Sequence, residues 1–269
     1  MNEAIQVKNL TRKFGEFTAV DNISFDVKQG EIFAFLGPNG AGKTTTIKML
    51  TTLLHPTSGQ LIVNGFSPVT QTDEVRKSFG IVFQDPSLDD ELTAYENMEF
   101  HAVFYGVKKS LREERIKSLL NLVELWDRKD DQVKHFSGGM KRRLEIARGL
   151  IHHPKILFLD EPTIGLDPQT RNFLWGYIKE MNKKENMTVF VTTHYMEEAE
   201  KIADRVAIID HGKIVTIGTP SEIKKKTKTT SLEEAFLKLT GKVIREEVGS
   251  AKDQMRMRRR AWGGRANRS

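Results

Sequence analysis

The chain has 269 residues, contains no cysteine and carries a formal net charge of +6. Without cysteine it can form no disulfide, no thiolate zinc site and no cysteine nucleophile. The segment after residue 249 holds seven basic residues against Asp253 alone, a net +6, so residues 1–249 are neutral. We therefore expect no basic nucleic-acid surface on the body of the protein and no specific nucleic-acid partner.

The longest apolar runs have about five residues, whereas a membrane-spanning helix needs about 18 or more. The N-terminal segment MNEAIQVKNL also lacks the apolar region of a signal peptide. These features predict a cytosolic protein that reaches a membrane only through a partner.

The first part of the chain has the period of two that half-buried strands show. Residues 5–10 and 22–30 follow this pattern, and Phe14 lies between them in a turn beside Gly15. We expect an N-terminal antiparallel β part. Further short strands and helices are expected, in chain order, at residues 31–36, 45–54, 60–65, 72–77 and 80–84.

Residues 85–154 have a different pattern. Three stretches, LTAYENMEFHAVFYG, LREERIKSLLNLVEL and MKRRLEIARGLI, carry apolar residues three and four positions apart, which is helix spacing. They predict a helical subdomain inserted into an α/β domain.

After residue 154, strands alternate with helices, which indicates a parallel sheet covered on both faces. The expected elements are strands at 156–160, 187–194 and 205–210, helices at 168–184 and 195–203, and a final strand and turn at 211–220. Residues 224–231 are predicted to be a polar, basic linker, followed by a helix in SLEEAFLKLTGKVIREE, residues 231–247.

The predicted domain division follows from these patterns. An α/β domain spans residues 1–220, with a core at 1–84 and 155–220 and a helical subdomain at 85–154. A helical extension spans 221–249. The basic tail at 250–269 has no periodicity, and it is either a disordered end or a contact for anionic lipid headgroups.

GPNGAGKTTT, residues 37–46, has the G-x-x-x-x-G-K-[ST] pattern of a phosphate-binding loop. An expected strand precedes it and an expected helix follows it, which is the context that such a loop requires. Its glycines let backbone N–H groups approach a phosphate, and the helix N-terminus attracts the negative charge. The residues expected to bind the nucleotide here are Gly37, Pro38, Asn39, Gly40, Ala41, Gly42, Lys43, Thr44 and Thr45.

The pattern therefore predicts a P-loop NTPase fold, α/β, with a parallel sheet. Asp160 and Glu161 follow the apolar strand ILFL, at the sheet edge where ligands of parallel sheets bind. Asp160 could hold Mg²⁺ beside Thr44, and Glu161 could polarise a water that attacks the γ-phosphate.

Gln84 and His194 each stand at the exit of an expected strand. Gln84 could sense a magnesium ion or a water, and His194 could hydrogen-bond a γ-phosphate. Each is also an ordinary residue for capping a loop, so position alone leaves both interpretations open.

FSGGM, residues 136–140, directly precedes an expected helix. Ser137 can cap this helix, and Gly138 and Gly139 leave its first N–H groups open. The segment is either a simple cap or a second anion site. Such a site could close on the nucleotide of its own chain or act across a symmetric dimer, and spacing does not decide between the two.

The order of GPNGAGKTT, Gln84, FSGGM, ILFLDEP, GLD and His194 resembles that of ABC-transporter ATPase subunits over residues 5–220. The resemblance implies a homodimer that holds two ATP molecules, each between one subunit's phosphate loop and the other's Ser-Gly-Gly helix. It also implies Mg²⁺ as a cofactor.

Residue roles are implied by the same resemblance. Phe14 would stack on adenine, where the family usually has tyrosine. Gln84 would couple the site to a membrane partner, and Asp167 would lie at the dimer seam. The remaining implied roles are phosphate and magnesium binding by Lys43 and Thr44, contact with the opposite ATP by Ser137, Gly138 and Gly139, magnesium binding by Asp160, general base catalysis by Glu161 and γ-phosphate contact by His194.

The segment FSGGMKRRLEIARGLIHHPKILFLDEPTIGLDP, residues 136–168, resembles the corresponding sequence of the daunorubicin-resistance-type drug and lipid exporters in particular. This implies a motor for efflux through a separate polytopic membrane permease, at the inner face of the cell membrane. A soluble ABC ATPase acting on DNA or ribosomes is the main alternative. A GTPase is the third, because NKKE at residues 182–185 nearly matches N-K-x-D.

Overall fold

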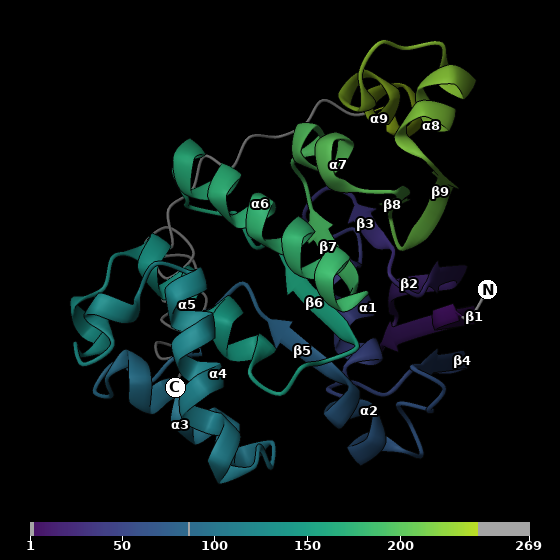
Figure 1. Ribbon diagram of the computed structural model, residues 1–269. Helices are drawn as coiled ribbons and strands as arrows, with labels where there is room; N and C mark the ends of the chain where they lie inside the picture. The colour runs from purple at the N-terminus through teal and green to yellow at the C-terminus, as the bar shows by residue number, and fades with distance from the viewer. Residues whose placement is uncertain (1–2, 86, 242–269) are drawn as a thin grey trace, which may run out of the picture.

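The computed structural model describes residues 3–85 and 87–241. Its helices and strands confirm the expected α/β fold, and Figure 1 shows two sheets beside a lobe of helices. The elements are β1 (Glu3–Phe14), β2 (Phe17–Lys28), β3 (Ile32–Leu36), α1 (Lys43–Leu50), β4 (Ser58–Val63), α2 (Thr72–Ser78), β5 (Phe79–Val82), α3 (Ala94–Phe104), α4 (Lys109–Leu122), α5 (Gly138–Leu150), β6 (Ile156–Asp160), α6 (Pro168–Glu185), β7 (Thr188–Thr193), α7 (Met196–Ile202), β8 (Arg205–Asp210), β9 (Lys213–Gly218), α8 (Pro220–Thr227) and α9 (Leu232–Thr240).

The two sheets differ in strand direction. The first has three antiparallel strands in the order β2-β1-β4, as expected for the N-terminal part. The second has six strands in the order β5-β6-β7-β3-β8-β9, and its pairs are parallel except for β8 with β9.

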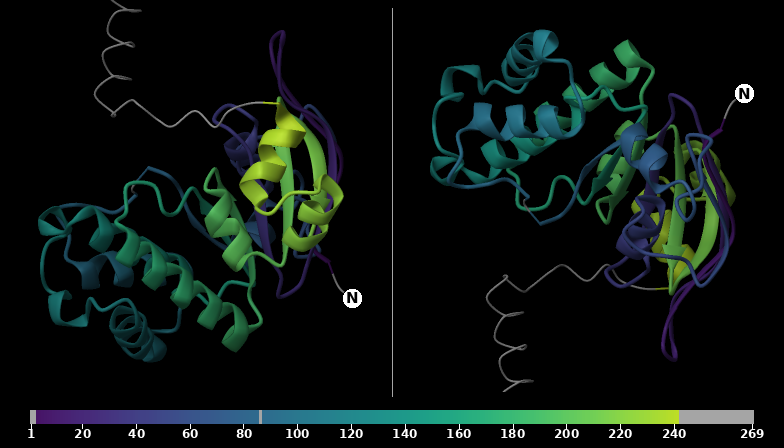
Figure 2. Two further views of the ribbon diagram at one scale, coloured as in Figure 1. Left: turned by 90° about the horizontal axis from the view of Figure 1, so that it is seen from above. Right: turned by 90° about the horizontal axis from the view of Figure 1, so that it is seen from below.

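The large sheet is covered on both faces, which explains why its strands read as continuous apolar runs. Ala34 and Leu36 of β3 pack with residues of α5, α6, α7 and α9. Phe33 and Phe35, one position apart from them, pack with the antiparallel sheet and α1. Figure 2 shows the antiparallel strands on the outer side of this second face, away from the helical lobe.

The register of the parallel strands brings three loops to one edge. Leu36 at the end of β3 pairs with Thr193 of β7, and Asp160 at the end of β6 pairs with Thr192. The segments that follow these strands therefore emerge side by side, which places residues 37–43, 161 and 194 at the same sheet edge.

The helical insertion is confirmed. α3, α4, α5 and two short 3-10 turns occupy the lobe of Figure 1, and α3 begins with a capping box between Thr93 and Glu96. No helix in residues 3–85 and 87–241 combines the length and the apolar character that crossing a membrane requires.

The predicted linker at residues 224–231 is wrong, because α8 runs through its first half. Thr219 and Glu222 form a capping box, Pro220 occupies the first turn, and Ile223 is buried. The run of three lysines at 224–226 indicates a solvated segment, so the buried positions of this short helix are not recognised from sequence. α9 confirms the first part of the expected helix at 231–247. The part of that helix after residue 241 and the tail at 250–269 lie outside the described residues.

Candidate nucleotide site

The phosphate-binding loop connects β3 to α1 and is tightly confined. A Cβ at Gly37 would lie 2.3 Å from the carbonyl oxygen of Ile209. Gly42, with φ +107°, would place a Cβ 2.6 Å from that of Ala19, so only glycine fits both positions. Gly42 is also the N-cap of α1 and gives no side-chain cap, which leaves the first N–H groups of the helix for an anion.

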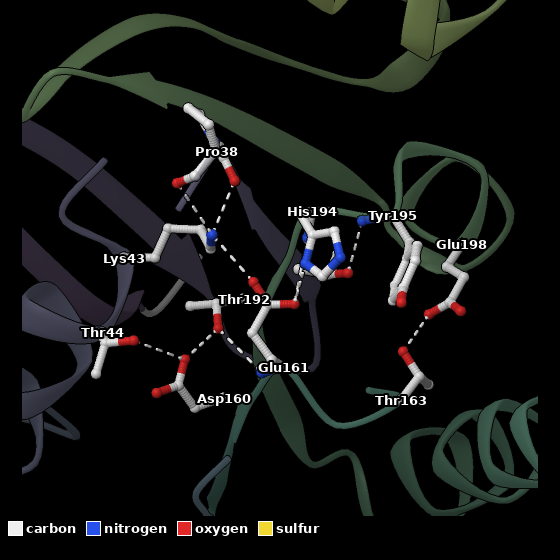
Figure 3. A network of polar contacts seen from close by, with 12 residues as sticks. Pro38, Lys43, Thr44, Asp160, Glu161, Thr163, Thr192, His194, Tyr195 and Glu198 are labelled. Atoms are coloured by element: carbon white, nitrogen blue, oxygen red, sulfur yellow. Dashed lines mark hydrogen bonds and ion pairs between the residues drawn. The ribbon is translucent and has the colours of Figure 1, made fainter. Parts of the chain in front are cut away.

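Lys43 is the first residue of α1, and its side chain is only 5% exposed. The ammonium nitrogen donates to the carbonyl oxygens of Gly37 at 2.8 Å and Pro38 at 3.3 Å. It also lies 3.0 Å from Oε1 of Glu161. Figure 3 marks this ion pair with a dashed line. A phosphate bound in the loop would compete with Glu161 for this cation.

Thr44 and Asp160 meet as expected from their positions at the sheet edge. The Thr44 hydroxyl donates to Oδ1 of Asp160 at 3.3 Å, and the Thr192 hydroxyl donates to the same oxygen at 2.5 Å. One buried carboxylate beside one hydroxyl is a donor set that suits Mg²⁺, which binds proteins through few carboxylates and takes further ligands from phosphates and water.

Glu161 directly follows β6 and is 4% exposed. Its φ of +49° is unusual for a residue with a side chain, and its N–H donates to the carbonyl and hydroxyl oxygens of Thr192. Burial alone would raise the pKa of Glu161, but the hydrogen bond from His194 and the charge of Lys43 outweigh it, so the pKa lies below its ordinary value. The carboxylate is therefore ionised at neutral pH.

His194 directly follows β7 and contacts the other oxygen of Glu161. Its Nδ1 lies 2.9 Å from Oε2, and its backbone N–H donates to the same oxygen at 3.3 Å. Because Glu161 is ionised, Nδ1 is the donor in this hydrogen bond. Arg171 lies over the ring of Tyr195, which packs 4.1 Å from the His194 ring and fixes its position.

Three other predicted residues lie on the surface. Gln84 is exposed two residues after β5, and Phe14 is 46% exposed at the end of β1, with the Arg12 guanidinium 4.5 Å from its ring centre. Asp167 is the N-cap of α6 and accepts from the backbone N–H of Thr170 at 2.9 Å. The hydrogen bonds from Thr170 lower the pKa of Asp167.

Ser137 caps α5, as predicted, by accepting from the N–H of Met140 at 3.2 Å. Gly138 is exposed and has open space where a Cβ would stand. Among the described residues, no hydrogen bond or ion pair joins residues 137–139 to the phosphate loop. The structure thus brings together Lys43, Thr44, Asp160, Glu161 and His194 but leaves the Ser-Gly-Gly segment apart from them.

Several residues around the site were missed by the sequence reasoning. Arg142 donates to the backbone carbonyls of Asp160, the last residue of β6, and of Glu161, and Thr192 bonds both of these residues. Glu198 accepts from Thr163 at 2.7 Å and from the Trp175 indole at 3.1 Å. The sequence gives a signal for Thr192, a polar residue at the end of an apolar strand, but Arg142 sits inside a basic run that resembles a solvated helix face.

Comparison with known proteins agrees with this geometry. The sequence profile of the family described as "ABC transporter" matches residues 20–164. Linearmycin resistance ATP-binding protein LnrL of Bacillus subtilis (strain 168) is 42% identical over 219 residues, which cover 81% of this chain and 70% of that protein. Daunorubicin/doxorubicin resistance ATP-binding protein DrrA of Streptomyces peucetius is 40% identical over 221 residues, covering 82% and 67%.

Among solved structures, the dimeric post-hydrolysis state of the ATP-binding cassette MJ0796 bound to ADP and Pi matches with a TM-score of 0.72 and 29% identity. The match covers 80% of this chain and 98% of that cassette. It confirms the fold, and the sequence matches confirm the resemblance to the daunorubicin-resistance type. The chain therefore belongs to the ABC transporter family, and it is an ATPase of the branch that contains the daunorubicin-resistance ATP-binding proteins.

Proposed function

We propose that the chain is the motor subunit of an exporter and drives efflux of a drug or lipid-like substrate through a separate membrane subunit. The observation that carries the proposal is the buried cluster of Lys43, Glu161 and His194 beside the phosphate loop. The relatives are named for resistance to linearmycin and to daunorubicin, which supports the substrate class.

Glu161 is proposed as the general base. Its ionised carboxylate accepts a proton from the water whose oxygen attacks the γ-phosphorus of ATP, and ADP leaves with the electrons of the broken P–O bond. Phosphate entering the loop draws Lys43 away from Oε1 of Glu161, which frees that oxygen for the water. When the His194 ring is doubly protonated, Nδ1 donates to Glu161 and Nε2 can donate to the γ-phosphate.

The other site residues have proposed binding roles. The backbone of residues 37–45 holds the phosphates, and the exposed ring of Phe14 stacks on adenine. Thr44, Asp160 and Gln84 would hold Mg²⁺. When bound, this ion neutralises the charge on the phosphate oxygens.

A second copy of the chain is proposed to complete the site. The N-terminus of α5 is open at Gly138, and Ser137 is an exposed residue. In a head-to-tail homodimer, Ser137, Gly138 and Gly139 would contact the ATP held by the other copy, with Asp167 at the seam. ATP would then close the dimer, and the dimeric state of the MJ0796 cassette supports this arrangement.

The membrane subunit is proposed to dock on the helical lobe. A hollow of about 540 Å³ is lined there by residues that include Phe100, Phe104 and Arg148. The two phenylalanines are 62% and 83% exposed, which is unusual for such large apolar side chains. This docking places the chain in the cytoplasm, peripheral to the inner face of the membrane. It also fits the proposed division into a core at 1–84 and 155–220, a subdomain at 85–154 and an extension from 221.

Purification of the full chain from native membranes tests the proposal. A polytopic membrane protein that co-purifies, and whose release follows loss of Phe100 and Phe104, would support an exporter. Ribosomes or DNA in its place would overturn the export function and favour the soluble alternative.

A further inference from the structure

Helix α5 carries a buried charged pair that the proposed chemistry does not use. Its first residue, Gly138, is exposed, whereas Arg142 and Glu145 one turn later are 7% and 3% exposed. Nη1 of Arg142 lies 3.2 Å from Oε2 of Glu145. Charged side chains are rarely buried so deeply unless an opposite charge and hydrogen-bond partners compensate for the lost contact with water.

Arg142 holds the backbone of the segment that contains Glu161. Its Nε donates to the carbonyl oxygen of Pro162 at 2.8 Å, and Nη2 donates to those of Asp160 at 3.2 Å and Glu161 at 3.1 Å. The N–H of Glu161 is meanwhile held by Thr192. The backbone on both sides of the Glu161 side chain is thus fixed, at a residue whose φ of +49° is unfavourable without such support.

The same pair holds the segment around Gln84. Nη1 of Arg142 also donates to the carbonyl oxygen of Phe83. Oε1 of Glu145 accepts from the backbone N–H of Ser87 at 2.7 Å, and Arg148 donates to the carbonyl oxygen of Ser87 at 2.8 Å. Helix α5 therefore holds the backbone of Phe83 and of Ser87, on either side of Gln84.

Glu145 stabilises the buried charge of Arg142. Burial lowers the pKa of Arg142, and the neighbouring carboxylates, chiefly Glu145, act in the opposite direction. Only a planar guanidinium has enough donors, in a fixed fork, to serve four carbonyls and a carboxylate at once. Lysine at this position would reach fewer of them.

We infer that Arg142, with Glu145 as its counter-ion, is a positioning residue for ATP hydrolysis that fixes Glu161 and the segment around Gln84 to helix α5. The inference rests on the proposed role of Glu161 as the base. Helix α5 would then connect three parts of the molecule. Its N-terminus is where a second copy would bind, and Arg142 and Glu145 join the helix to Glu161 and to Ser87, which lines the hollow of the proposed docking site.

The test is Mg-ATP hydrolysis by the full chain, measured as phosphate release for Arg142→Gln and for the matched control Arg143→Gln. Arg143 neighbours Arg142 on α5 but donates to the carbonyl oxygen of Val123 and to the exposed carboxylate of Glu124, and it forms no hydrogen bond or ion pair with residues 160–162 in the described chain. We expect Arg142→Gln to lower kcat about tenfold to a hundredfold, because small displacements of a reacting group cost rates of this size, with KM for ATP nearly unchanged. Arg142→Lys should recover part of the loss, and the control should keep wild-type kcat.

Two further variants separate positioning from folding. Arg142→Gln combined with Glu145→Gln removes both buried charges, so it should melt near the wild-type temperature yet keep the low kcat. In a Glu161→Gln background, Arg142→Gln should cause a smaller loss than in the wild type, because the part of its effect that acts through Glu161 is already gone.

These measurements separate a failure of the positioning role of Arg142 from a failure of the proposed base. Recovery of kcat in the double variant, a raised KM with normal kcat, full additivity with Glu161→Gln, or equal loss in the Arg143 control would each overturn the inference. Full activity of Glu161→Gln alone would instead overturn the proposed base, so the two failures can be told apart.

Discussion

Two regions of the molecule present functional side chains in opposite ways. At the carboxyl edge of the large sheet, Lys43 and Glu161 are 5% and 4% exposed and are paired with each other. On the helical lobe, Phe100 and Phe104 are 62% and 83% exposed, and residues 137–138 face the surface. The first region is assembled within one chain, whereas the second offers groups that other chains could contact.

The protonation of titratable groups also differs between the two regions. At the sheet edge, partners hold the pKa of Glu161 below its ordinary value, so the group keeps its charge. Within the helical lobe, burial lowers the pKa of His101 to about 3 and that of His152 to about 4, so both rings are neutral at pH 7. The carboxylate of Glu161 thus stays charged where a charged ligand would bind, whereas these two imidazoles stay neutral inside the helical lobe.

The largest expected effect comes from removing the charge of Glu161. Glu161→Gln should lower ATP hydrolysis by about 10²-fold or more, the usual range for loss of a general base, while ATP binding persists. Glu197→Gln, an exposed carboxylate on α7, is the matched control and should hydrolyse at the wild-type rate. Hydrolysis by Glu161→Gln at the control's rate would contradict the proposed role of Glu161 as the general base. In gel filtration with ATP, the Glu161 variant should run as a dimer, and a monomer would count against a shared site.

A side chain at Gly138 tests whether the lobe contributes to catalysis from outside its own chain. A Cβ at Gly138 meets nothing within 4 Å, so Gly138→Asp should fold normally, and its carboxylate suits a helix N-terminus. If α5 binds the ATP of a second copy, blocking its N–H donors should lower hydrolysis by about 10²-fold, as does loss of an anion-stabilising donor in other enzymes. Gly176→Asp on α6, an equally open position, is the control and should leave activity intact. Normal hydrolysis by Gly138→Asp would remove the case for a shared site.

The exposed phenylalanines provide the converse test. Phe104→Ser should leave thermal stability within about 0.5 kcal/mol of wild type, because an 83% exposed side chain buries little area, and hydrolysis by the isolated chain should not change. Recovery of the chain with native membranes should fall several-fold. Leu53→Ser, at a position 56% exposed on another part of the surface, should bind membranes as wild type does. Equal membrane recovery of both variants would show that the docking face lies elsewhere.

The sheet-edge region was largely predictable from sequence because its signals are local. Each predicted residue follows an apolar run, and the ends of parallel strands must converge, so the pattern alone places Lys43, Asp160, Glu161 and His194 together. Thr192 required the register of β6 and β7, which no single segment contains.

The helical lobe was less predictable, because its important contacts cross long stretches of sequence. Arg142 and Glu145 lie in KRRLE, which resembles a solvated helix face until α5 is packed against Phe83, Ser87 and residues 160–162. The same limitation explains why the lysine-rich start of the expected linker is not recognised as a helix from sequence, because Ile223 is buried only through tertiary packing.

Lowering the pH should weaken the helical lobe through His101 and His152. Their pKa values are lowered from 6.5 to about 3 and about 4, chiefly by burial. Arg148 further lowers the pKa of His101, His153 and Arg115 further lower that of His152, and the carbonyl of Phe79 partly opposes this for His152. The rings pack around Tyr105, which lies 4.0 Å from His152 and 4.7 Å from His101.

The sign follows from proton binding. Below pH 6.5 the unfolded chain protonates both histidines while the folded chain does not, so stability is fully present above pH 6.5 and is lost as the pH falls toward 4. Between pH 7 and pH 5, each ring should lower the free energy of unfolding by about 2 kcal/mol or less. Thermal melts of His101→Gln combined with His152→Gln should show a smaller decrease over this interval than wild type, whereas His211→Gln, at an exposed histidine, should follow wild type. Parallel pH dependence in all three proteins would mean that these rings are charged in the folded lobe, and that the contrast with the charged sheet edge does not hold.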